Sequence, residues 1–246
     1  RDAFDGSAAK LNINFKSAII ETLLLFMVIP RKINFTQLER YGKRCEQCYR
    51  QTFTKKFDWI RYNMELMNTL FDRNDRKAIA IDPSYISKSG KHTPWIGYFW
   101  SGCAGQAKRG LEILGVGAID IDKRDCVMLK AEQTPDTITL DNVGCTLIDW
   151  YLKVLERIKD RLLEVSNYVV ADAYFSKATF AKGLDSMGFH LVSRFRDDAN
   201  LMYIHDGQPT GKRGRPKVHG DKIDFKHLDY TKIQEIETNN EDGKLY

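Results

Sequence analysis

Two aspartates, Asp82 and Asp172, each follow a short apolar run, Lys77-Ala-Ile-Ala-Ile and Tyr168-Val-Val-Ala. Each run is typical of a buried β-strand, and a carboxylate at its end can leave the core and reach a cleft. Two carboxylates on neighbouring strand ends repel each other unless a cation neutralises them, and Mg²⁺ or Mn²⁺ suits carboxylate oxygens. A pair of such ions activates water in phosphodiester cleavage. The spacing alone leaves open the alternative that each aspartate is a turn residue.

The segments around the two aspartates alternate between strand and helix patterns. Branched and aromatic residues predict strands over residues 77–82, 95–100, 111–121, 168–172 and 189–193. Apolar residues at helical spacing predict one long helix over 137–165, and a second over 176–186 that Ser176 caps. Asp120 and Asp122 follow the third strand, where we expect a turn. The resulting order, βββαβαβ, predicts an α/β fold.

The first 75 residues have the apolar spacing of helices. The run Leu23–Ile29 is shorter than the roughly 20 residues of a membrane helix, and we expect a buried helix there. Residues 31–77 contain twelve Lys/Arg against six Asp/Glu, an excess larger than the net charge of +5 of the whole chain. Arg44, Lys55 and Lys56 belong to this group. The excess favours contact with DNA phosphates, and a solvated helical face explains it equally well.

Residues 196–246 differ in composition from the rest of the chain. They contain the basic loop Gly211-Lys-Arg-Gly-Arg-Pro-Lys217. Its cations resemble an AT-hook core, which enters a narrow minor groove, and a solvated loop is the alternative. The cations are Lys212, Arg213, Arg215 and Lys217. We expect a strand from Tyr230 to Thr238, a turn over 239–243 and a returning strand from Lys244, so that the chain ends within a hairpin, as a C-terminally truncated protein would.

The composition limits the class of protein. The 246 residues are 43% hydrophobic and 29% charged, which excludes a wholly disordered chain. Five cysteines argue against a disulfide framework and fit a reducing compartment. Cys45 and Cys48 form a lone CxxC, which we interpret as two helix thiols because zinc takes four ligands. The segment 89–93 is not a phosphate loop, because Tyr85 stands where that motif requires glycine.

Four segments, taken together and in order, resemble the DDE transposases of the IS4-type insertion sequences. They are Ile79–Thr93, Gly97–Gly102, Val169–Phe175 and Lys212–Lys217. In that family an RNase H-like mixed sheet carries the first catalytic Asp at the end of its first strand and the second at the end of its fourth. Asp82 and Asp172 match these positions, so the resemblance implies that they are catalytic and hold two Mg²⁺ or Mn²⁺ ions. It also implies cut-and-paste cleavage and strand transfer on double-stranded DNA by a homodimer.

The third catalytic residue of the family is missing from this pattern. The family's Glu belongs to a Tyr-x-x-Arg-x-x-x-Glu helix motif, which the sequence does not contain; Glu235, Glu237 and Glu241 do not match it. The resemblance therefore implies a transposase fragment that is inactive by itself. Two alternatives stay open: a non-catalytic DNA-binding remnant of an insertion element, and a different nuclease of the RNase H-like superfamily. The basic helical segment ahead of the core favours a transposase.

The resemblance also divides the chain into three parts. Residues 1–75 form a helical, DNA-binding domain, residues 76–195 the first part of the RNase H-like catalytic core, and residues 196–246 the start of a β-rich insertion that precedes the Glu helix. Within the core, Lys88 and Lys91 follow Asp82 closely enough to touch a phosphate beside it. We expect a protein without a membrane segment, in the bacterial cytoplasm and associated with the nucleoid.

Overall fold

The chain divides into two compact units, Arg1–Ser193 and Arg194–Tyr246. The computed structural model describes residues 12–30, 32–90, 92–196, 198–207, 214–215 and 217–233. Each unit contains a sheet of its own. Both aspartates belong to the first unit, so its sheet determines where they lie.

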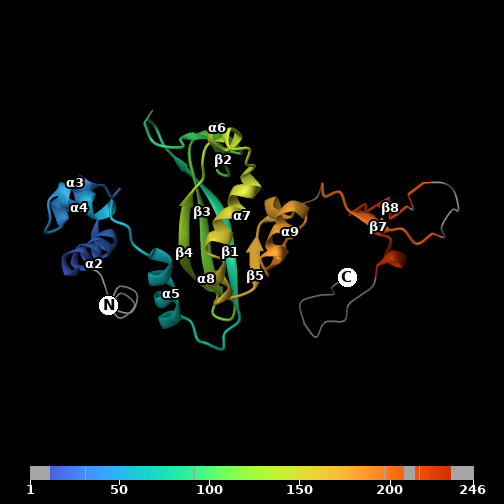
Figure 1. Ribbon diagram of the computed structural model, residues 1–246, viewed down its shortest axis with the longest axis horizontal. Helices are drawn as coiled ribbons and strands as arrows, with labels where there is room; N and C mark the ends of the chain where they lie inside the picture. Colours follow the sequence, from blue (N-terminus) through green and yellow to red (C-terminus); the bar gives the residue numbers. More distant parts are fainter. Residues whose placement is uncertain are drawn as a thin grey trace. The chain divides into compact units, whose positions relative to one another are not determined.

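The sheet of the first unit has six strands (Figure 1). Their bounds are β1 Lys77–Ser87, β2 Gly97–Ser101, β3 Gln106–Asp120, β4 Asp125–Gln133, β5 Tyr168–Ala171 and β6 His190–Ser193. The order across the sheet is β2-β3-β1-β5-β6, and β4 pairs with β3 beyond the part of β3 that pairs with β2. The strands β1, β5 and β6 are parallel to one another, whereas every pairing of β3 is antiparallel. The sheet is therefore mixed.

One face of this sheet is covered by helices (Figure 1). The helices are α5 Trp59–Leu70, α6 Thr137–Asn142, α7 Leu147–Arg157, α8 Lys159–Leu163 and α9 Ala178–Ser186, with the short 3-10 helix η1 Ala173–Phe175 between β5 and α9. The main core cluster joins Ile79 and Leu114 of the sheet to Met64 of α5, Tyr151 of α7 and Phe180 of α9. Burial of these apolar side chains is the main force that holds the layers together.

The remaining helices of the first unit are α2 Ile13–Val28, α3 Phe35–Tyr41 and α4 Glu46–Phe53. Leu25 and Ile29 are buried with residues of α3 and α4, but Met27 is 84% exposed. The expected buried helix over Leu23–Ile29 is thus buried along one side only, since residues four apart share a helix face and those between them do not. None of the described helices combines the length and apolar character needed to span a bilayer. The domain boundary that the sequence predicts at residue 75 comes just after α5, and Met64 and Met67 of this helix belong to the same core cluster as the sheet.

The long helix expected over 137–165 is wrong, because the segment forms α6, α7 and α8. Gly144 has φ of +60°, a left-handed conformation that an α-helix cannot contain. Two residues later, Thr146 and Asp149 form a reciprocal capping box that starts α7. Ile138, whose spacing placed it on the buried stripe, is 73% exposed.

Three further sequence predictions can be compared with the fold. The strand β4 was not predicted, and β1 continues through Asp82 to Ser87 instead of ending at the carboxylate. Ser176 does not cap α9; its hydroxyl donates to the Ala173 carbonyl at 2.8 Å. The turn expected after the third strand is confirmed, because the Asp120 carboxylate accepts from the backbone N–H of Asp122 and of Lys123.

The second unit contains a two-stranded antiparallel sheet, β7 Met202–Ile204 with β8 His219–Lys222. The strand expected to begin at Tyr230 is wrong at its start, since Tyr230–Lys232 is the 3-10 helix η2. The Asp229 carboxylate accepts from the Thr231 N–H and so closes a turn there. The turn over 239–243 and the returning strand from Lys244 lie outside the described residues.

Candidate active site

The parallel pairing of β1 with β5 brings the two aspartates to the same level of the sheet. Ile79 lies opposite Val169 and Ala80 opposite Val170. The same offset of 90 residues relates Asp82 to Asp172, each two residues beyond the last pair. Neighbouring strands are about 4.8 Å apart, so the backbones at these two positions are neighbours. The two side chains also share a face, because successive residues of a strand alternate between faces.

The face that carries the aspartates is opposite to the helical layer. Ile79 and Ile81 of β1 point into the core, whereas Asp82 is exposed. Across the sheet, the strand pairings align Met128, Ala80 and Val192 in one row on the same face as Asp82. Met128 and Val192 are about half exposed. A charged group on this face therefore keeps its contact with water, and a ligand can approach it.

Local hydrogen bonds position each carboxylate. Asp172 begins η1: its Oδ1 accepts from the Tyr174 N–H at 3.0 Å, and its backbone carbonyl accepts from the Ser193 hydroxyl at 2.8 Å. The Asp82 Oδ2 lies 3.3 Å from the Ser84 hydroxyl, which donates to it. These contacts orient both side chains while leaving further carboxylate lone pairs for a ligand.

The charges of the two aspartates are not compensated by nearby cations. Among the described residues, neither carboxylate forms an ion pair with a Lys, Arg or His. Two carboxylates that lie side by side without a cation are the arrangement that a divalent metal stabilises. The described part of the chain contains no group of three or more His, Cys, Asp or Glu that could hold a metal ion by itself. The described residues thus contain no complete metal site of this kind.

Comparison with known families covers most of the chain, including both aspartates. A model of the DDE superfamily of endonucleases matches residues 36–242. The chain belongs to the DDE superfamily of endonucleases. The mixed α/β fold expected from the resemblance is confirmed as an RNase H-like fold of this superfamily. No curated protein matches the chain. Membership implies nuclease- or transposase-type chemistry with DNA as the substrate.

The basic residues predicted to bind DNA occupy different surroundings in this DDE protein. Arg44 forms an ion pair with Glu21 and donates to the Ser17 hydroxyl, so it joins α2 to the segment before α4. The Lys55 ammonium lies 5.4 Å from the centre of the Phe15 ring. The exposed cations among the predicted set are Lys55, Lys56, Lys88, Arg215 and Lys217, and Lys91, Lys212 and Arg213 lie outside the described residues. Their contacts with DNA stay predictions.

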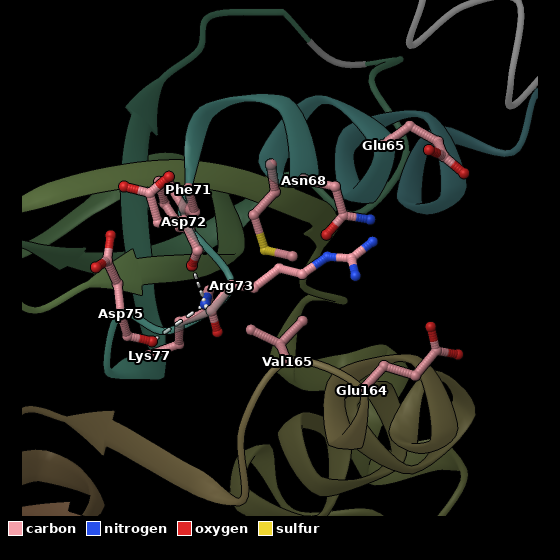
Figure 2. Close-up of a pocket in the computed structure, with 10 residues that line it drawn as sticks. Glu65, Asn68, Phe71, Asp72, Arg73, Asp75, Lys77, Glu164 and Val165 are labelled. Carbon is pink, nitrogen blue, oxygen red and sulfur yellow. Dashed lines mark hydrogen bonds between the residues drawn. The ribbon is translucent and has the colours of Figure 1, made fainter.

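A cavity of about 510 Å³ lies at the other end of β1 (Figure 2). Its wall includes Asp72 and Asp75, whose carboxylates pair with Lys123 at 2.6 Å and 3.3 Å. The Lys77 ammonium donates to the backbone carbonyls of Asp72, Arg73 and Asp75. Lys123 thus already compensates the two aspartates of this cavity. Lys77 precedes Asp82 by five residues of extended chain, about 17 Å, so the cavity is separate from the acidic pair.

The CxxC pair lies at the start of α4. Cys45 is the N-cap residue, both thiols are exposed, and the two sulfurs are 3.1 Å apart. The hydrogen bond with Cys48 lowers the pKa of Cys45. No third His, Cys, Asp or Glu joins these two in the part of the chain that the structure describes, and their interpretation as helix thiols stays a prediction.

One buried acidic residue was missed by the sequence analysis. Glu112 of β3 is buried beneath α7 and accepts a hydrogen bond from the Tyr151 hydroxyl at 2.6 Å. Burial, then the charge of Glu112, raise the pKa of Tyr151; the same two causes, followed by the charge of Asp172, raise the pKa of Tyr174. The sequence contained a signal for Glu112: it is the single charged residue within the apolar stretch 111–119. A charged residue in such a stretch indicates a buried partner.

Proposed function

We propose that this DDE protein is a transposase of the IS4-type group, which cleaves DNA at transposon ends and transfers the cut strand to a target. The observation that supports the proposal is the parallel register of β1 and β5, whose offset relates Asp82 to Asp172 two residues beyond its last pair. If each aspartate were only a turn residue, there would be no reason for the two to occupy corresponding positions on neighbouring strands. Two carboxylates at one level, without a compensating cation among the described residues, support a metal-binding role for the pair.

In this proposal Asp82 and Asp172 would hold Mg²⁺ or Mn²⁺. Such ions activate a water molecule or a 3′-hydroxyl and stabilise the leaving oxygen of a phosphodiester. The contribution of the chain is to fix the carboxylates. The Tyr174 N–H and the Ser193 hydroxyl hold Asp172 from two sides, and the rigid β1–β3 ladder holds Asp82. Fixed ligands lose little conformational entropy when they bind an ion.

DNA would reach the site through basic segments outside the pair. The excess of Lys and Arg over residues 31–77 and the basic loop at 212–217 would neutralise phosphates, together with Lys88 and Lys91, which follow Asp82 by six and nine residues in the sequence. Binding of this kind releases counterions and weakens steeply as salt increases. It needs no metal, because its residues are separate from the acidic pair. A homodimer on two transposon ends would be the active form.

A second candidate is a non-catalytic DNA-binding remnant of an insertion element. The observation that favours it is the absence of a Tyr-x-x-Arg-x-x-x-Glu motif from the sequence. Two carboxylates leave the ions with too few ligands, so we expect the chain of 246 residues to nick DNA weakly or not at all. The two candidates therefore differ in metal binding at the pair rather than in activity.

The test is Mn²⁺ binding measured by electron paramagnetic resonance on the chain and on its Asp82→Asn and Asp172→Asn variants. We expect the parent to bind Mn²⁺ and each variant to bind at least about tenfold more weakly, because an amide is an uncharged and weaker ligand. Nicking of a labelled transposon end with Mg²⁺ is measured in parallel. Equal Mn²⁺ affinity in all three proteins would show that the aspartates are turn residues and that the catalytic proposal is wrong.

A further inference from the structure

The strand β1 does not end at the acidic pair but continues into a three-stranded antiparallel extension of the sheet (Figure 1). In this extension, residues 84–87 of β1 pair with residues 110–113 of β3, and residues 97–101 of β2 pair with residues 106–110 of β3. Beyond Ala80 and Val170 the recorded pairing between β1 and β5 stops. The extension therefore projects from the sheet at the level of Asp82.

The extension has the charge of a nucleic-acid-binding surface. From residue 83 to residue 111 the sequence contains four Lys or Arg and no Asp or Glu. The four are Lys88, Lys91, Lys108 and Arg109. A run of this length without one acidic residue is unusual in a chain that is 29% charged, and its positive charge complements a phosphate backbone.

Two large aromatic side chains are exposed on β2. Tyr98 is 71% exposed and Trp100 is 65% exposed, whereas Phe99 between them is buried. Residues two apart on a strand share a face, so the two exposed rings lie side by side. Tyr98 lies opposite Arg109 on β3. Rings of this size are costly to leave in water and are typical of binding surfaces.

The exposed rings share their face with the acidic pair. Asp82 lies opposite Gly115 of β3, and Arg109 lies six residues away from Gly115 along that strand. An even number of residues keeps the same face, so Arg109 and Tyr98 belong to the face of Asp82. Six residues of strand span about 20 Å.

Side-chain contacts make the extension rigid. The Tyr85 ring packs over Gly110, where a Cβ atom would lie 2.5 Å from the ring. The Tyr85 hydroxyl donates to the Arg109 carbonyl at 2.7 Å, and the Arg109 guanidinium donates to the Gly90 carbonyl at 2.9 Å. These bonds join Tyr85 of β1 and Gly90, in the segment after β1, to Arg109 of β3. A platform that is already ordered binds without a large entropy cost.

We propose that this extension binds unpaired DNA, with bases stacked on Tyr98 and Trp100 and phosphates neutralised by Arg109 and Lys88. Aromatic rings beside cations are the means by which proteins hold single strands, because every base offers a face for stacking. In a duplex these faces are covered by neighbouring bases. The inference rests on the proposed function and deepens it, since it specifies as the substrate DNA with unpaired bases about 20 Å from Asp82.

The test is fluorescence anisotropy of a labelled twelve-nucleotide oligo-dT, titrated with the full chain in EDTA. We expect the Tyr98→Leu/Trp100→Leu double variant to bind at least about tenfold more weakly than the parent, because stacking is lost. The matched control is Tyr98→Phe/Trp100→Phe, which keeps two aromatic rings and should bind within about threefold of the parent. Tyr168→Leu, on the same face at the far end of β5, should bind as the parent does.

Three results would overturn the inference. The Leu double variant could bind oligo-dT as tightly as the parent, the Phe double variant could bind it as weakly as the Leu variant, or the Leu variant could lose as much affinity for a duplex of the same length as for oligo-dT. Circular dichroism establishes that each variant is folded before it is compared. The assay contains no metal and measures no cleavage, so its outcome is independent of Asp82 and Asp172. Unchanged oligo-dT affinity in the Leu variant refutes the extension as a binding site, whereas unchanged Mn²⁺ affinity in the aspartate variants refutes only the proposed function.

Discussion

The acidic pair should reduce the stability of the metal-free protein, and Asp82→Asn should relieve that repulsion. Two exposed carboxylates on strands about 4.8 Å apart repel each other by about 1 kcal/mol in a water-like dielectric. For a unit of this size, 1 kcal/mol corresponds to a change in Tm of about 2–4 °C. We therefore expect Asp82→Asn to raise Tm by about 2–4 °C in EDTA. Asparagine keeps the oxygen that accepts from the Ser84 hydroxyl, so the local structure is preserved.

Addition of Mn²⁺ should reverse this order of stability. An ion at 100 times its Kd stabilises the parent by about 2.7 kcal/mol, which raises Tm by about 5–10 °C. The variant, with one carboxylate left, should show little of this rise. Differential scanning fluorimetry with and without Mn²⁺ measures both effects. The matched control is Asp185→Asn on α9, an exposed aspartate away from the pair, which should not raise Tm in EDTA and should keep the Mn²⁺ response.

Two outcomes would refute the reasoning about the pair. An Asp82→Asn variant whose Tm in EDTA equals that of the Asp185→Asn control would show that the two carboxylates do not repel each other. A full Mn²⁺ response in Asp82→Asn would show that the ion binds elsewhere. Either result would mean that the register of β1 and β5 does not bring the side chains together.

Three further predictions follow from contacts elsewhere in the chain. Tyr151→Phe should lower the free energy of unfolding by about 1–3 kcal/mol, because it leaves the buried Glu112 carboxylate without its donor; urea denaturation measures this, and an unchanged midpoint would contradict it. Cys45, whose pKa is lowered by Cys48, should be alkylated at a lower pH than Cys126, whose pKa is raised by burial. Mass spectrometry measures the alkylation rate of each cysteine as a function of pH, and the reverse order would disprove the prediction. Arg215→Ala should weaken duplex binding and reduce the slope of log K against log salt by about 1; identical slopes would assign the loop to solvent.

The sequence alone determined the elements that carry the aspartates. The apolar runs before Asp82 and Asp172 are too short for helices and too apolar for loops, so each was predicted as a strand, and both are strands. The helical pattern of the first 75 residues was also present in the sequence, because residues three and four apart share a helix face. These predictions depend on local chemistry, which is independent of the rest of the fold.

The tertiary structure decided what local chemistry does not encode. The strand β4 was missed because its residues 125–133 include charged and polar positions, and it is a strand because β3 offers its edge there. The break between α6 and α7 depends on Gly144 and on the Thr146 cap, which outweigh the continuous apolar spacing. In each case a partner or a backbone conformation overrides the pattern of side chains.

The placement of the acidic pair shows the same division. The sequence indicated that two carboxylates end two strands, but a strand end gives no information about its neighbour. Only the parallel pairing of Ile79 with Val169 and of Ala80 with Val170 relates Asp82 to Asp172. Likewise, only the fold shows that Tyr98 and Trp100 point to solvent on the face of Asp82 instead of into the core. The physical reason is that contacts between residues far apart in the chain form through packing and strand register, which a linear pattern does not specify.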